Sequence, residues 1–373
     1  MNKINKTYRY NSTLHLCLLF FAIIPVTKMV SLPCFLSEFC GRSLWISGII
    51  STIIDTCLAL YMAYLRHKMQ KPVSQLLEET IGKTATKILF IIYSLLFIGR
   101  SLIFVSGEKY FIETTYYEET AFGFVFIPFF LIVFYFCFKG LKPYERLSLF
   151  LVIFTVLGIA LIIFLSVGEM RINFILPIKP TSLKGILKGS LFNFTFGGEG
   201  IYLLFFTGKA NTEKKPVFYL VISFLSAYTL IIVFFVIFYA TFGPIAQTKL
   251  FAMAQMAHYS DILSGVGRVD TIAVFMIDFV RLFALTLPLS VSTEMLKYVF
   301  GENKKTNFTI AGVIAIICFV FTYFFGTQFI HWFNVFYKFV LPFFMFFVYF
   351  LPLFLFILIK KTNEKANGVL EKK

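Results

Sequence analysis

Long apolar runs alternate with short polar segments along most of the chain. Runs of about 20 apolar residues are long enough to cross the hydrocarbon core of a bilayer as α-helices. We predict ten such spans, at residues 13–33, 44–65, 88–111, 121–138, 147–167, 188–208, 216–242, 271–299, 308–326 and 333–359. The expected fold class is therefore all-α and polytopic. Residues 1–373 form one transmembrane permease-like domain, with a ten-helix membrane core at 13–359 between cytoplasmic ends at 1–12 and 360–373.

One apolar run, at residues 189–206, contains the sequence Gly197-Gly198-Glu199-Gly200. A glycine costs about 1 kcal/mol in a helix interior. An ionised Glu at bilayer depth costs a few kcal/mol. Because both costs fall on the same four residues, we predict a broken sixth helix whose free backbone groups and carboxylate line a cavity.

A second break is predicted in the first span, at residues 25–28, where Pro25 removes a backbone donor and Lys28 adds a charge. Ten spans divide into five plus five, so spans one and six run in opposite directions. Breaks at corresponding places indicate an inverted repeat with a binding site between its halves. The expected substrate-binding residues are Pro25, Thr27, Lys28, Phe196, Gly197, Gly198, Glu199 and Gly200.

Two short helices are predicted outside the spans. Residues 72–82 have an amphipathic pattern that ends at Gly82, which is typical of a helix lying in the membrane interface. Residues 250–258 are expected to form a short helix on the outer side, where it would gate access from outside.

Composition and charge place this pattern in a membrane. Hydrophobic residues make up 59% of the chain and charged residues 14%, against about 25% charged in soluble proteins. The net charge of +15 raises the possibility of nucleic acid as a partner, but the basic residues gather in short loops on alternate sides. That distribution follows the positive-inside rule, so we expect both termini to be cytoplasmic and no nucleic-acid partner.

Charged residues at membrane depth are the candidate chemistry. Asp278 and Arg281 are i,i+3 neighbours on one helix, and Asp270 extends the same polar stripe. These residues form either structural ion pairs or a network that couples ions to a ligand, and Lys28 either binds a ligand carboxylate or replaces a coupling cation. The expected coupling or ion-pair network is Asp55, Arg100, Asp270, Asp278 and Arg281, beside Lys28 and Glu199.

Motifs of catalysis and metal binding are missing from the sequence. It has no Walker loop, no HExxH and no GxSxG, and its six cysteines do not have the spacing of metal ligands or of a disulfide framework. We therefore expect no enzyme activity, no cofactor, no metal centre and no structural disulfide.

Short motifs in a fixed order then suggest a family. They are Leu32-Pro33, Trp45-Ile46-Ser47, Glu79-Thr80-Ile81-Gly82-Lys83, Asn173-Phe174-Ile175-Leu176-Pro177, Gly198-Glu199-Gly200 and Arg268-Val269-Asp270. With these motifs the chain resembles the spore germination permeases. These are the B subunits of spore germinant receptors, in the amino acid–polyamine–organocation transporter superfamily. The chain departs from the family at residues 25–28, where a glycine-containing turn is usual, and at Asp278, where a Trp is frequent.

The resemblance implies a five-plus-five inverted repeat with an amino acid or similar small solute bound between spans one and six. It also implies partner subunits in the spore inner membrane. Two functions stay open: a germinant-sensing receptor subunit, or a stand-alone proton-coupled amino acid or amine transporter. In either, we expect a ligand carboxylate at backbone amides near Thr27 and Lys28, and a ligand amino group at Glu199.

Overall fold

Helices account for every regular element in the computed structural model, which describes residues 13–69, 71–115, 122–177, 182–206, 215–259 and 269–354. The predicted cytoplasmic ends at 1–12 and 360–373, Arg268, and the extremities of spans four, six and ten lie outside these ranges. The α-helices are α1 (Thr13–Lys28), α2 (Leu32–Cys40), α3 (Leu44–Lys68), α4 (Val73–Ile81), α5 (Lys83–Thr115), α6 (Phe122–Lys139), α7 (Lys142–Ser166), α8 (Leu183–Asn193), α9 (Pro216–Phe242), α10 (Ala252–His258), α11 (Val269–Phe300), α12 (Lys304–Phe325), α13 (Phe329–Val335) and α14 (Leu341–Met345).

Six helical stretches among the described residues are long and apolar enough to cross a membrane. They are Leu32–Lys68, Lys83–Thr115, Lys142–Glu169, Pro216–Thr248, Val269–Phe300 and Lys304–Phe354. Two shorter apolar helices, Thr13–Lys28 and Phe126–Lys139, accompany them. These lengths and compositions are those of a polytopic membrane protein. Each predicted span overlaps a described helix, while the ten-span count and the inverted repeat stay predictions.

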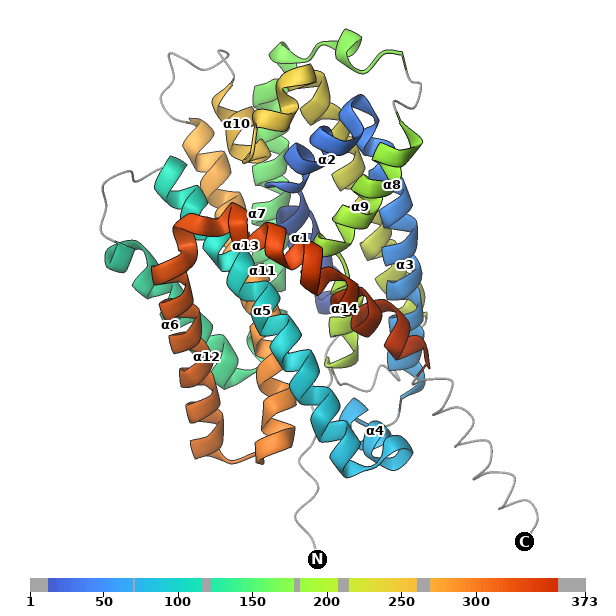
Figure 1. Ribbon diagram of the computed structural model, residues 1–373, viewed down its shortest axis with the longest axis vertical. Coiled ribbons are helices and arrows are strands. Elements are labelled where there is room, and N and C mark those ends of the chain that lie inside the picture. Colours follow the sequence, from blue (N-terminus) through green and yellow to red (C-terminus); the bar gives the residue numbers. More distant parts are fainter. Residues whose placement is uncertain are drawn as a thin grey trace, which may run out of the picture.

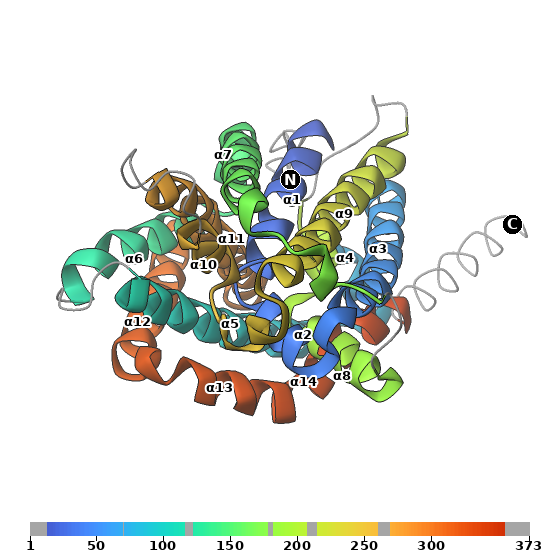
Figure 2. The same ribbon diagram turned by 90° about the horizontal axis from the view of Figure 1, so that it is seen from above.

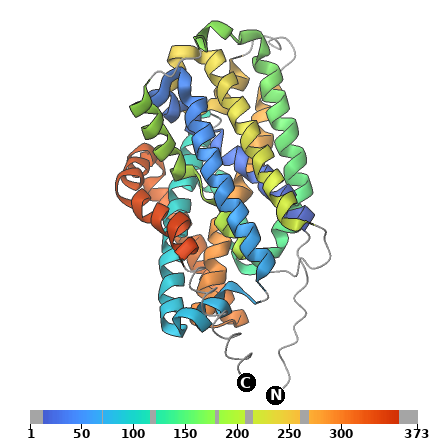
Figure 3. The same ribbon diagram turned by 90° about the vertical axis from the view of Figure 1, so that its right-hand side faces the viewer.

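The first helix occupies the middle of the bundle. It packs against α7, α9 and α11, and Figure 2 shows it running inward between α7 and α9. On one side α3 packs along α9, as Figure 3 also shows, and on the other α5 packs along α11 and α12 along α6. The run from α13 to α14 crosses the outside of α5 (Figure 1). The side chains that α1 contributes to a site are therefore positioned by contacts with three other helices.

Both short helices that the sequence predicts are confirmed. Helix α4 ends at Gly82, whose φ of 86° favours glycine at a helix end. Helix α10 packs against α11 and α7. Its first residue, Ala252, donates its backbone N–H to the Val30 carbonyl at 2.7 Å, in the turn that follows α1. Helix α10 thus contacts the break in the first span directly.

The first break lies later than predicted. Helix α1 continues through Pro25 to Lys28, and the chain leaves the helix at residues 29–31. Pro33 stands in the first turn of α2, where its missing N–H costs nothing and its ring disfavours helical geometry just before it. The prediction of a break at residues 25–28 was therefore wrong by a few residues, because Pro33 rather than Pro25 sets its position.

The second break is confirmed where it was predicted. Helix α8 tightens into a 3₁₀ turn, η4 (Phe194–Phe196), before an extended Gly197 and a left-handed Gly198 with φ of 86°. A second 3₁₀ segment, η5 (Glu199–Leu204), continues the span. A Cβ on Gly198 would lie 2.6 Å from a Val348 methyl carbon, so both the backbone angle and the space require glycine there.

Close packing of α7 on α11 gives a test of the bundle. A Cβ on Gly158 of α7 would lie 2.8 Å from Ile277 and 3.3 Å from the Ala273 carbonyl of α11. We expect Gly158→Val to lower the free energy of unfolding by about 1–3 kcal/mol through overpacking. Thermal unfolding in detergent measures this. Leu157→Val is the matched control, because Leu157 is 52% exposed, and an equal loss in both variants would contradict the packing.

Candidate functional site

Asp55 on α3 joins the two broken helices. Its Oδ2 lies 2.9 Å from the Lys28 ammonium at the end of α1. Its Oδ1 accepts hydrogen bonds from the Gly198 backbone N–H at 3.3 Å and from the Tyr349 hydroxyl at 2.5 Å. All these groups are buried. A buried carboxylate with a cationic partner and two further donors offsets much of its desolvation cost, so this contact holds both breaks against α3.

Lys28 is held by two further groups. Its ammonium lies 4.0 Å from Glu199 Oε2 and 4.9 Å from the centroid of the Tyr228 ring on α9. A desolvated ammonium over an aromatic face is attracted by the ring quadrupole. Lys28 therefore occupies the place of a cation between two carboxylates. Both roles that the sequence left open for Lys28 stay predictions, and direct ligand binding would require Lys28 to leave Asp55.

Glu199 is bound more loosely than Asp55. Arg100 Nη2 lies 3.8 Å from its Oε1, and Arg100 also donates to the Tyr202 hydroxyl at 3.3 Å. Within the described part of the chain, neither carboxylate oxygen of Glu199 has a hydrogen-bond donor. The Phe104 and Phe344 rings lie 5.4 Å and 5.0 Å from the Arg100 guanidinium and fix its position. Glu199 is thus charge-balanced but left with free lone pairs.

A cavity of about 30 Å³ lies beside these free lone pairs. It is enclosed by α1, α5, η5 and α11, and has room for about two water molecules. Its polar lining consists of Thr27, Arg100, Ser101, Glu199, Tyr202 and Arg281. Ile23, Phe104, Ala284, Leu285, Leu287 and Pro288 form the apolar remainder.

Three buried groups around this cavity lack hydrogen-bond partners among the described residues. They are the Ser101 hydroxyl, the Glu199 carboxylate and Arg281 Nη1, although this last atom also lies in an ion pair with Glu108. Buried polar atoms are nearly always hydrogen-bonded, so a group of exceptions facing one cavity indicates a polar occupant. Such an occupant needs a donor toward Glu199 and an acceptor toward Arg281. A small zwitterion has both.

Arg281 makes an ion pair that the sequence did not suggest. Its Nη1 lies 2.9 Å from Oε2 of Glu108 on α5, although the pair lacks the angles of a hydrogen bond. Glu108 is fully buried. Glu108 lies near the end of a predicted span, where a charged side chain can reach the membrane surface and is not expected to be buried. Because α5 extends to Thr115, Glu108 instead lies inside the helix.

Two other predicted network residues lie apart from the cavity. Asp270, in the first turn of α11, pairs with the His258 ring of α10. It is 11 residues, or about 16 Å of helix, before Arg281, so the predicted stripe does not act as one site. Asp278 is buried on α11, close to one turn before Arg281.

The predicted binding residues fall into three groups. Thr27 and Glu199 line the cavity. Lys28, Gly197 and Gly198 lie with Asp55 instead: a Cβ on Gly197 would be 2.9 Å from both Asp55 oxygens. The rest have packing positions. Pro25 lies inside α1, the Phe196 ring packs 5.1 Å from Phe104, and Gly200 leaves no room for a Cβ beside the Ala59 backbone.

Sequence reasoning missed one serine and three tyrosines of the site. Ser101, Tyr202, Tyr228 and Tyr349 are ordinary residues in apolar runs, and the chain has 19 tyrosines. Only the position of Ser101 next to Arg100 was a usable signal, because a polar residue beside a buried charge is a candidate for the same site.

Comparison with known proteins places the chain in a family. A family model described as spore germination protein matches residues 12–330, which is most of the chain. The chain belongs to this family. The match confirms the resemblance that the motifs suggested, and a search of curated proteins found no match. Spore germination proteins of this type are a transporter- and receptor-type membrane family and not a known enzyme family. With its membrane-length helices, this spore germination protein is an integral membrane protein.

The Lys28–Asp55 pair gives a test of the site. Lys28→Met leaves Asp55 as a buried charge without its closest cation, so we expect the free energy of unfolding to fall by about 3–5 kcal/mol. Asp55→Asn in the same chain removes the uncompensated charge and should recover most of that loss. Thermal unfolding of both variants measures the difference, and equal stability of the single and double variants would contradict the pairing.

Proposed function

We propose that this chain is the membrane-embedded germinant-sensing subunit of a spore germinant receptor. It binds an amino acid or similar small solute between its broken first and sixth spans, in the cavity beside Glu199. It passes the resulting change to partner subunits of the receptor. The expected place is the spore inner membrane, with both termini in the cytoplasm.

The observation that carries this proposal is the set of buried polar groups around the cavity that have no hydrogen bond within the described structure. Glu199 offers acceptors to a ligand amine, and Arg281 offers donors to a carboxylate. Ser101 hydrogen-bonds to either. Hydrogen bonds that involve a charged group contribute about 1.5–3 kcal/mol each. A zwitterion therefore gains more here than a neutral solute of equal size.

This orientation differs from the one expected from sequence. Thr27 and Lys28 end α1, so the backbone there presents free carbonyls rather than amides. Carbonyls favour the amino end of a ligand. Lys28 is already engaged by Asp55. We therefore assign the ligand carboxylate to Arg281, which also lines the cavity.

The small size of the cavity beside Glu199 indicates how a ligand would have to enter it. Space for about two water molecules is too small for an amino acid. Binding therefore requires the elements around the cavity to separate, and the structure corresponds to a closed form. A receptor needs such a coupled change between its ligand site and its partners.

A stand-alone proton-coupled transporter is the second candidate. The observation that favours it is the buried cluster of Lys28, Asp55 and Glu199, in which an ammonium lies between two carboxylates. Intramembrane groups of this kind mark proton pathways in many transporters. In this alternative a proton on Glu199 accompanies the amino acid or amine across the membrane.

Glu199→Gln tests both candidates. The amide keeps the shape but loses the charge that faces the ligand amine, so we expect binding of labelled amino acids in proteoliposomes to fall at least about tenfold. Glu294→Gln is the matched control, because that carboxylate is 38% exposed and pairs with Lys297. Unchanged binding in Glu199→Gln would refute the site. Concentrative uptake driven by a pH gradient would favour the transporter over the receptor.

Arg281→Lys tests the carboxylate end. Lysine keeps a positive charge beside Glu108 but loses the guanidinium fork, so binding of the preferred amino acid should weaken by about tenfold. The methyl ester of that amino acid lacks the carboxylate and should bind equally poorly to wild type and variant. Equal binding of the acid and its ester by the wild type would show that Arg281 does not recognise the ligand.

A further inference from the structure

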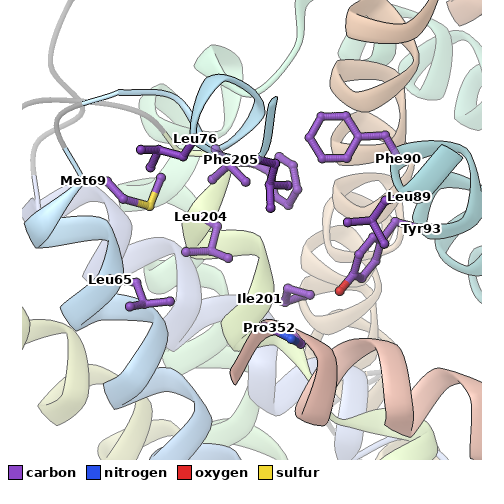
Figure 4. Close-up of a pocket in the computed structure, with 12 residues that line it drawn as sticks. Leu65, Met69, Leu76, Leu89, Phe90, Tyr93, Ile201, Leu204, Phe205 and Pro352 are labelled. Carbon is purple, nitrogen blue, oxygen red and sulfur yellow. The ribbon is translucent and has the colours of Figure 1, made fainter. Parts of the chain in front are cut away.

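A second cavity lies next to η5. It has a volume of about 80 Å³, and its twelve lining residues are apolar or aromatic. Figure 4 shows it between Leu65 of α3 and Met69 just after that helix, Phe90 of α5, and the side chains of Ile201 and Leu204 from η5.

The second cavity offers nothing for a polar ligand. Tyr93 brings the only side-chain polar atom of the lining, and its hydroxyl donates to the Phe347 carbonyl at 2.6 Å. Cavities lined in this way stay dry, and protein interiors rarely leave them unfilled. The second cavity is therefore not explained by a bound polar solute.

Segment η5 has close contacts on one side and this empty volume on another. A Cβ on Gly200 would lie 3.1 Å from Ala59 Cα, so η5 and α3 touch there backbone to backbone. Ile201, Leu204 and Phe205 border the cavity. Contact with Ala59 limits the movement of η5 at Gly200, while the cavity separates Ile201, Leu204 and Phe205 of η5 from Leu65 of the same helix α3. The 3₁₀ geometry of η5 also has weaker hydrogen bonds than an α-helix.

Helix α4 closes the second cavity from its other side. Val73, Leu76 and Leu77 of α4 belong to the lining. Glu79 of α4 is exposed and pairs with Lys71, which precedes the helix, and just over half of each side-chain surface is accessible. A shift of η5 into the cavity therefore presses on a helix that has a charged, accessible surface.

Glu199, the first residue of η5, links this arrangement to the ligand site. We propose that η5 moves into the apolar cavity when a ligand engages Glu199, and that this movement displaces α4, whose exposed face presents the signal to a partner. The signalling part rests on the proposed function, whereas the freedom of η5 to enter the cavity does not. In this movement the side chains of Ile201, Leu204 and Phe205 enter the second cavity.

Filling or enlarging the cavity tests the movement without any ligand. Leu89→Phe, on α5, fills the space, and Leu89→Ala enlarges it. Hydrogen–deuterium exchange in residues 73–81 and 199–206 should slow about tenfold in Leu89→Phe, which corresponds to about 1.4 kcal/mol of opening free energy. It should quicken in Leu89→Ala. Leu95→Phe is the control on the same helix, because Leu95 is 65% exposed.

Two exchange results would contradict the proposed movement of η5. Unchanged exchange in both Leu89 variants, or equal slowing in Leu95→Phe, would overturn the proposal. If Leu89→Phe does not fold, Leu76→Phe fills the same space from α4.

A second measurement uses a panel of labelled L-amino acids in proteoliposomes. Leu89→Phe should still bind what the wild type binds, but addition of that amino acid should no longer change the exchange of α4. A change in α4 equal to that of the wild type would refute the link. If the wild type binds no amino acid, the proposed function fails, while the ligand-free exchange still decides whether η5 uses the cavity.

Discussion

The ion pair between Lys28 and Asp55 is the contact on which the site depends. Lys28 ends α1 and Asp55 lies in α3, yet Asp55 also accepts the Gly198 amide from the break in the sixth span. Both breaks are thereby held at one carboxylate. Separating these charges inside the protein would leave each unpaired at a cost of several kcal/mol. Glu199 follows Gly198 directly, so the position of Gly198 on Asp55 also fixes the position of Glu199 beside the cavity.

The two buried carboxylates at the breaks have different roles because their surroundings differ. Asp55 has a close cation and two further donors, so nothing is left for a ligand. Glu199 has cations only at 3.8 Å and 4.0 Å and no hydrogen-bond donor in the described structure. The contacts of Asp55 are thus made within the fold, whereas Glu199 keeps free lone pairs beside the first cavity.

Apolar periodicity and glycine placement predicted the helices, the break at Gly198, and the short helices α4 and α10. The break in the first span was misplaced, because Pro25 is tolerated inside a well-packed helix while Pro33 starts a new one. The partners of the charges were beyond sequence reasoning. Asp55 meets Tyr349 across 294 positions, and Arg281 meets Glu108 from another helix. A span shows which residues are buried, but not which neighbour each one faces.

The most direct test of this account is an experimental structure in lipid nanodiscs with the amino acid that binds most tightly. We expect density for the ligand between Glu199 and Arg281, in contact with Ser101, while Lys28 stays on Asp55. Ligand density elsewhere, or a Lys28 ammonium that has left Asp55 for the ligand carboxylate, would contradict it.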